Sequence, residues 1–264
     1  MSTHEGAPDE GGEAAVPLAA RARALLEAPP WSDRPYALTL LAVEPPEDAP
    51  AGPQRLWFVV DAADVRDLDA EWREPLLRHR LRRAGDESFE TTVVTTDGIE
   101  ALLDGVSRRS LEVRWEFRHA APLHDPSGRG ERLAAAARRL PGDALERLVR
   151  PLYLQAGRAL EALARAHAAS SDASEALAGG EAASALTRLA CILEEGAHPT
   201  ADWLDAAARQ TGLGRRIAPW LDTRSPATND AVLAEAATAL RAYFADREWL
   251  REPEIYALRP PPRQ

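Results

Sequence analysis

The 264-residue chain contains no lysine, and its 32 basic residues are all arginine. A chain without lysine cannot form a Schiff base through a side-chain amine, anchor pyridoxal phosphate or supply the lysine of a P-loop. Those classes of enzyme site are therefore excluded. The arginines can still hold anions, because a planar guanidinium donates two parallel hydrogen bonds to a carboxylate or a phosphate.

Cysteine is almost absent as well. Cys191 is the only one in the chain, which excludes an internal disulfide and a cysteine-based zinc cluster. It lies in the apolar run LTRLACIL, which predicts a buried and unreactive thiol. The histidines and carboxylates show no spacing that would place three ligands on one ion. We expect neither a metal site nor a cofactor.

Long apolar runs and excess positive charge are also missing. The formal net charge of −10 argues against nucleic-acid binding, which relies on basic surface to neutralise phosphates. No run approaches the ~18 apolar residues of a membrane span. The acidic, glycine-rich start resembles no secretory signal, so we expect a cytoplasmic protein with a disordered tail over 1–13.

The first half of the chain contains short apolar runs separated by turn residues, which is typical of a small sheet with covering helices. Its proline-rich segment, PPEDAPAGPQ, predicts an exposed loop. The predicted strands are 36–43, 55–62 and 91–96, the predicted helices are 14–28 and 71–84, and the predicted loop is 45–54.

The segment SLEVRWEF (110–117) alternates strictly between apolar and charged residues. This alternation predicts a half-buried strand with Glu112, Arg114 and Glu116 on one side. A helix is the alternative, because Leu111 and Trp115 also fit helical spacing. The sheet is then expected to end in a loop over 121–128.

From Arg129 onward the apolar residues recur at helical spacing. The segment SSDASEALAGG (170–180) predicts a flexible connector between two of these helices. The sequence thus predicts an α+β protein, with a small mixed-sheet domain over 14–128, an all-α helical bundle over 129–258 and a tail over 259–264.

The order of these elements resembles nucleotidyltransferases of the kanamycin and lincosamide nucleotidyltransferase type. PLHDPSGRGERL (122–133) is similar to the segment that joins the catalytic domain of that family to its bundle. ILEEGAHPTADWLDAA (192–207) is similar to a later segment, in which a loop precedes a tryptophan-bearing helix. The resemblance implies a nucleotidyltransferase-like fold over nearly the whole chain.

The chain departs from that family where nucleotide and metal would bind. The resemblance would place a Gly-Ser loop after the first strand, but the sequence there is LAVEP (41–45). It would place paired aspartates at the start of the second strand, where Pro53 and Arg55 stand instead. Neither residue can ligate Mg²⁺. The resemblance therefore implies a degenerate member that lacks the two-metal site.

Candidate site residues gather around 110–119. A histidine beside carboxylates can act as a general base, and paired arginines can hold an anion. The catalytic candidates are His119, Glu116 and Glu112, and the substrate-binding candidates are Arg114, Arg118, Trp115, Tyr153 and Asp97. The resemblance implies the role of Tyr153, on the first bundle helix, and of Asp97, as the counterpart of a third carboxylate. Glu194, Glu195 and His198 precede a helix; we expect them in a solvated loop, and the alternative is that they reach the cleft.

These residues predict a metal-independent enzyme that carries out acid–base chemistry, such as elimination or cyclisation, on a small charged metabolite, for example in specialised biosynthesis. An arginine-lined pocket with His119 pointing inward would favour this hypothesis. The alternatives are a non-catalytic, antitoxin-like binding protein and an active Mg²⁺-dependent nucleotidyltransferase with differently placed ligands. The expected partner is a small molecule with an anionic group, together with a second copy of the chain if it forms a homodimer.

Overall fold

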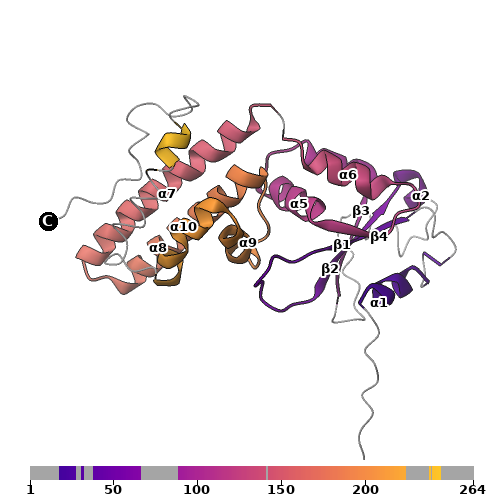
Figure 1. Ribbon diagram of the computed structural model, residues 1–264, viewed down its shortest axis with the longest axis horizontal. Helices are drawn as coiled ribbons and strands as arrows, with labels where there is room; N and C mark the ends of the chain where they lie inside the picture. Colours follow the sequence, from indigo (N-terminus) through magenta and orange to yellow (C-terminus); the bar gives the residue numbers. More distant parts are fainter. Residues whose placement is uncertain are drawn as a thin grey trace, which may run out of the picture.

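The computed structural model describes residues 18–27, 31–32, 38–66, 89–140, 142–223, 238 and 240–244. The predicted tails and the predicted helix over 71–84 lie outside these residues. Figure 1 shows the described elements as two parts: a small sheet with its covering helices at one end and a group of long helices at the other.

The sheet has four strands in the order β3-β2-β1-β4. β1 pairs antiparallel with β2 and β4, whereas β2 pairs parallel with β3. The three predicted strands are confirmed. β4 lies where the sequence predicts the start of a loop; it is a short edge strand, where Pro122 costs no ladder bond. The strands are β1 (Leu38–Val43), β2 (Gln54–Val60), β3 (Phe89–Thr95) and β4 (Ala120–His124).

Alternate residues of each strand point to opposite faces of the sheet, and both faces are covered. On one face, Leu40 and Phe58 pack in a core with residues of α1 (Leu18–Ala24) and the short 3-10 helix η1 (Leu25–Glu27). On the other face, Leu41 and Trp57 share a core with three helices. These helices are α4 (Thr96–Leu103), α5 (Arg108–Arg118) and α6 (Arg129–Ala137). A five-residue helix, α2 (Ala62–Arg66), follows β2.

Residues 110–117 form part of a helix, α5, and not the predicted strand. The hydroxyl of Ser107 accepts a 3.1 Å hydrogen bond from the N–H of Ser110 and so caps the start of this helix. Every residue from Ser110 to Phe117 is buried. Because the helix is enclosed on all sides, its charged residues also lie inside the protein, and their alternation does not mark a solvent-exposed face. The helix alternative is confirmed.

The helical half is built around two long helices that pack side by side (Figure 1). The structure replaces the predicted connector over 170–180 with the first turns of α8. Gly179 lies on the side of α8 that faces α7, where a methyl group in its place would make an ordinary contact with Cδ1 of Leu163 at 3.8 Å. The helices are α7 (Ala144–Ala168), α8 (Asp172–Glu195), α9 (Leu204–Gln210) and α10 (Gly212–Thr223).

The α+β class, with a mixed four-stranded sheet followed by helices, is therefore confirmed. Within the described residues, one helix, α8, is long and apolar enough to cross a membrane by length and composition. However, 61% of its apolar window is buried inside the protein, as in a core helix.

Candidate functional site

α5 places the predicted acid–base residues on one face. Glu112, Glu116 and His119 follow one another at intervals of four and three residues, which share one face of a helix. Glu112, Glu116 and His119 therefore lie on one side of the segment although it is a helix and not the predicted strand. Arg114 does not lie on this side, because a residue two positions from Glu112 lies on another side of a helix.

Glu116 is committed to contacts inside the protein. Its Oε2 accepts a 2.8 Å hydrogen bond from the indole N–H of Trp57, and its Oε1 lies 3.4 Å from Nη1 of Arg55. Burial raises the pKa of its carboxyl group, while the positive charges of Arg55 and Arg109 and the bond from Trp57 act in the opposite direction. Glu116 is only 4% exposed, so it lies away from any ligand on the surface.

Arg55 lies at the centre of this cluster, at the position where the resemblance would place a metal-binding aspartate. Its guanidinium contacts carboxylates from three elements: Glu90 on β3 at 3.4 Å, Glu116 on α5 and Asp202 before α9. A divalent cation does not fit among these groups, since a guanidinium already stands between the carboxylates. Across the described ranges, no three His, Cys, Asp or Glu side chains are grouped as a metal ion would require.

His119 caps the C-terminal end of α5. Its Nε2 lies 2.9 Å from Oε2 of Glu195, and its ring stacks on Trp115 with centroids 4.1 Å apart. The ring centroid of Trp115 lies 6.0 Å from that of Trp203. His119 is not among the residues that line either of the two hollows described below. The structure therefore places His119 against Trp115 and Glu195, whereas the carboxylate of Glu116 contacts Arg55 and Trp57. Neither described hollow lies beside His119.

Arg114 is fully buried and binds main-chain carbonyls. Its guanidinium donates to the carbonyls of Leu103 and Arg139, and to that of Ala137 at 3.3 Å. Burial, followed by the like charge of Arg118, lowers its pKa. Arg114 thus ties α5 to the ends of α4 and α6. Burial likewise lowers the pKa of Arg118.

The remaining two candidates lie on other elements. Tyr153 is 0% exposed in the core of the helical half, where its ring packs edge-on against Phe244 with centroids 4.9 Å apart. Asp97 follows β3 closely, as the second residue of α4. It is exposed in the first turn of α4, where a carboxylate complements the positive end of the helix dipole.

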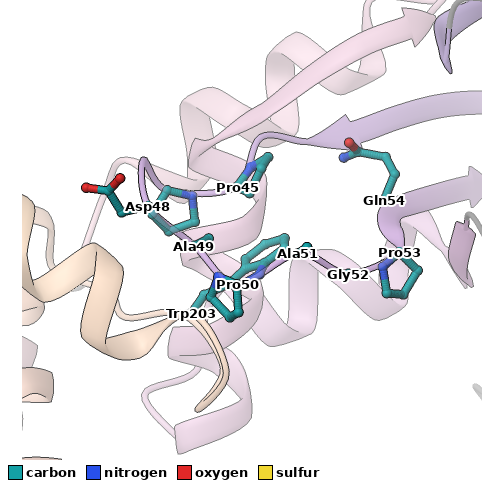
Figure 2. Close-up of a pocket in the computed structure, with 10 residues that line it drawn as sticks. Pro45, Asp48, Ala49, Pro50, Ala51, Gly52, Pro53, Gln54 and Trp203 are labelled. Atoms are coloured by element: carbon teal, nitrogen blue, oxygen red, sulfur yellow. The ribbon is translucent and has the colours of Figure 1, made fainter.

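A first hollow, of about 220 Å³, lies between the predicted loop and Trp203 (Figure 2). Prolines and main chain form most of its wall. Its polar side chains are Asp48, whose carboxylate points outward in Figure 2, and Gln54, whose amide donates to the carbonyl of Val43. This hollow presents few groups that could carry chemistry.

A second hollow, of about 310 Å³, lies where α5, α7 and α8 meet the segment that follows α8. Three arginines from three helices line it: Arg108, Arg147 and Arg188. His198 completes its polar lining. We call it the arginine groove. Its apolar lining consists of Val106, Leu111, Leu148, Pro151, Leu152 and Ile192.

The three arginines differ in their partners. Arg108 donates to Glu112 at 2.9 Å, and Arg147 donates to Asp143 at 2.9 Å. Arg188 has no carboxylate within ion-pair distance among the described residues. Its Nη1 donates to the hydroxyl of Ser184, and its buried Nε has no hydrogen-bond partner. Burial and the like charge of Arg108 lower its pKa, while Glu112 acts in the opposite direction.

His198 is buried, at 2% exposure, and not in the solvated loop that the sequence predicts. Its Nδ1 lies 2.8 Å from the carbonyl oxygen of Pro199. Since a carbonyl can only accept, Nδ1 carries the proton, and Nε2 is left with its lone pair. Burial lowers the pKa of this imidazole and so favours its neutral form. The composition of HPTADW around it resembles a solvated loop, so no local signal indicates the burial.

No protein-family description matches the chain, and no curated protein does. Among solved structures, it is similar to a nucleotidyltransferase-like protein from Exiguobacterium sibiricum 255-15, with a TM-score of 0.38 and 13% identity. The match covers 78% of this chain and 66% of that one. Similarity at this level transfers neither an activity nor a ligand.

Proposed function

We propose that the chain is a metal-independent enzyme that performs acid–base chemistry on a small anionic molecule bound in the arginine groove. The scaffold in this proposal is a degenerate nucleotidyltransferase-like one, as the sequence motifs indicate. The observation that carries the proposal is Arg188, a half-buried cation whose buried Nε has no hydrogen-bond partner and which has no carboxylate partner in the described structure.

Uncompensated charge is the reason for expecting an anion. A buried donor without a partner costs about 1–3 kcal/mol, and more when the group is charged. Within the groove the like charge of Arg108 adds to this cost, while Glu112 offsets part of it. A carboxylate or phosphate in the groove would pair with the guanidinium of Arg188 through its terminal nitrogens and so offset the uncompensated charge.

The apolar lining indicates the rest of the ligand. Leucine, isoleucine, valine and proline side chains form the remaining wall, which suits a hydrocarbon or ring attached to the anionic group. A volume of about 310 Å³ is at the lower end of the roughly 300–1,000 Å³ typical of small-molecule sites. A metabolite with one anionic head and a compact apolar body matches both properties.

His198 is the candidate general base. Its tautomer leaves Nε2 as the acceptor, and its lowered pKa keeps it neutral near pH 7. In an elimination, Nε2 would take a proton from a ligand carbon as the bond to the leaving group breaks. The electron pair of the C–H bond forms the new double bond, and the leaving group departs with the other pair toward the arginines. The imidazolium then returns its proton to solvent.

The alternative is a non-catalytic binding protein that uses the same groove. Glu116 and His119, the predicted acid–base residues, already have partners within the protein. Binding without turnover requires only the arginines and the apolar wall. Both functions need Arg188 to hold the anion. Only the catalytic function also needs His198.

A thermal-shift screen tests this proposal. The wild-type protein is screened in EDTA against small carboxylates and phosphate monoesters, and against ATP with and without Mg²⁺. We expect stabilisation by an organic anion without metal, because a ligand at 100 Kd adds about 2.7 kcal/mol. The Arg188→Met variant should lose this shift. Arg165→Met, which removes an exposed arginine of α7 paired with Glu161, should keep it. Stabilisation by ATP only in the presence of Mg²⁺ would contradict the proposal.

A further inference from the structure

One guanidinium contacts the second half of the segment that joins α8 to α9. Nη1 of Arg55 donates to the hydroxyl of Thr200 at 2.6 Å, and Nη2 donates to the carboxylate of Asp202. The same guanidinium lies 3.8 Å from the ring centroid of Trp203, in a cation–π contact. Arg55 therefore contacts three of the four residues from Thr200 to Trp203, although it lies on β2 in the other half of the chain.

Arg55 is itself held in place from behind. Glu90 on the neighbouring strand and Glu116 on α5 each lie 3.4 Å from it. Trp57 fixes Glu116 through a 2.8 Å hydrogen bond. The Arg55 side chain is only 12% exposed, so its orientation is set by these neighbours. Arg55 therefore fixes the segment after α8 relative to the sheet and α5.

The same segment carries His198 into the arginine groove. Gly196 ends α8 with a φ of 66°, and α9 begins only at Leu204. No regular structure fixes the residues between them, which makes their conformation depend on contacts at each end. Thr200, the nearest residue that Arg55 holds, is two positions beyond His198.

We propose that Arg55 is a positioning residue that holds the segment after α8 so that Nδ1 of His198 meets the carbonyl of Pro199 and Nε2 faces the groove. The proposal rests on the proposed function, because the orientation of His198 matters to the reaction only if His198 acts there. Arg55 touches no ligand in this account and acts through the segment alone.

The charged groups around His198 come from two other helices. Arg188 of α8 and Arg108 of α5 disfavour its protonation, and Glu112 of α5 favours it. None of these groups contacts Arg55 in the described structure. A change in His198 after substitution of Arg55 would therefore report a movement of the segment and not the loss of a direct charge interaction.

The tautomer of His198 is the test, measured on the ligand-free full chain. Long-range ¹H–¹⁵N spectra of ¹⁵N-histidine-labelled protein distinguish Nδ1–H from Nε2–H for each of the six histidines, and His198→Gln assigns the signal. We expect a single Nδ1–H form in the wild type and a mixture of tautomers in Arg55→Gln. The matched control is Arg209→Gln, which loses ion pairs of 2.8 and 2.7 Å to Asp205 and Asp222 beside the segment and should leave His198 unchanged.

A second variant covers the case in which Arg55→Gln does not fold. The double variant Thr200→Ala with Asp202→Ala removes both hydrogen bonds of Arg55 to the segment, leaves its cation–π contact with Trp203, and keeps its pairing with Glu116 and Glu90. It should give the same mixture of tautomers. An unchanged Nδ1–H form in a folded variant of either kind overturns the proposal. Because no ligand is present, failure of this test is separate from failure of the thermal-shift screen.

Discussion

The indole N–H of Trp57 donates a 2.8 Å hydrogen bond to Oε2 of Glu116, from a buried strand to a buried helix. This bond and the contact with Arg55 are what keep a carboxylate inside the protein between the sheet and α5. Burial nevertheless outweighs them and raises the pKa of Glu116 above its ordinary value of 4.5. The consequence is a pH dependence of stability that can be measured.

Glu116→Gln should change that pH dependence. A carboxyl group whose pKa is raised in the folded state binds protons more tightly there, so its contribution to stability is present below pH 4.5 and is lost as pH rises through the folded pKa. The variant lacks this loss. Its free energy of unfolding, minus that of the wild type, should increase between about pH 4.5 and 8. Urea unfolding across this range measures the difference; a constant or falling difference would refute the assignment.

Arg114→Met should destabilise the fold. The substitution keeps an apolar stem but leaves the carbonyls of Leu103, Ala137 and Arg139 without their donor. Each buried unsatisfied acceptor costs about 1–3 kcal/mol, so we expect a loss of about 3 kcal/mol or more. Arg109→Met, which removes a half-exposed arginine of the same helix, is the control and should cost about 1 kcal/mol or less. Equal effects of the two variants would mean that Arg114 is not the tie between helices described above.

Arg188→Met should have the opposite effect on stability. It replaces a cation that has no carboxylate partner with an apolar side chain of similar length. We expect the free energy of unfolding of the ligand-free protein to increase by about 1 kcal/mol, because the variant no longer places an unpaired donor inside the protein. The midpoint of chemical unfolding measures this change. A loss of several kcal/mol would show that Arg188 has a structural partner and is not kept for an anion.

His198→Gln should remove part of the decrease in the free energy of unfolding that the wild type shows as pH falls. Burial holds the pKa of His198 below its ordinary value of 6.5, so the unfolded chain takes up a proton first as pH falls. The wild type is therefore destabilised as pH falls through about 6.5, and Gln removes this contribution. The stability of the variant relative to the wild type should rise between about pH 7.5 and 5. A relative stability that falls over this range would mean that His198 is protonated in the folded state.

The sequence predicts β1, β2 and β3 but neither β4 nor the helical form of α5. β1 and β2 are continuous apolar runs bounded by turn residues, and such runs become central strands. In α5, Arg114 and Glu116 are buried by neighbours from distant parts of the chain, which no local pattern shows. The alternation over 110–117 therefore predicts a strand with one solvent-exposed face, whereas the segment is a helix with every one of these residues buried.

The candidate site is predictable only in part for the same reason. The sequence places Glu112, Glu116 and His119 on one element, as the structure does, but none of them lines the arginine groove. The arginine groove is not predicted, because Arg108, Arg147 and Arg188 are separated by long stretches of chain and meet only when three helices pack. The sequence shows that residue 198 is a histidine, but it does not show that this histidine is buried, because the burial depends on contacts with distant residues.

The account depends most on the unpaired Nε–H of Arg188, and one titration tests it directly. Arginine Nε–H signals are recorded by ¹H–¹⁵N spectroscopy in EDTA while phenyl phosphate, an anion with an apolar ring, is added to the wild-type protein. The account predicts a saturable shift concentrated on Arg188 and Arg108, and no such shift for Arg209. A signal of Arg188 that stays in place, or one that moves only after Mg²⁺ is supplied, would contradict it.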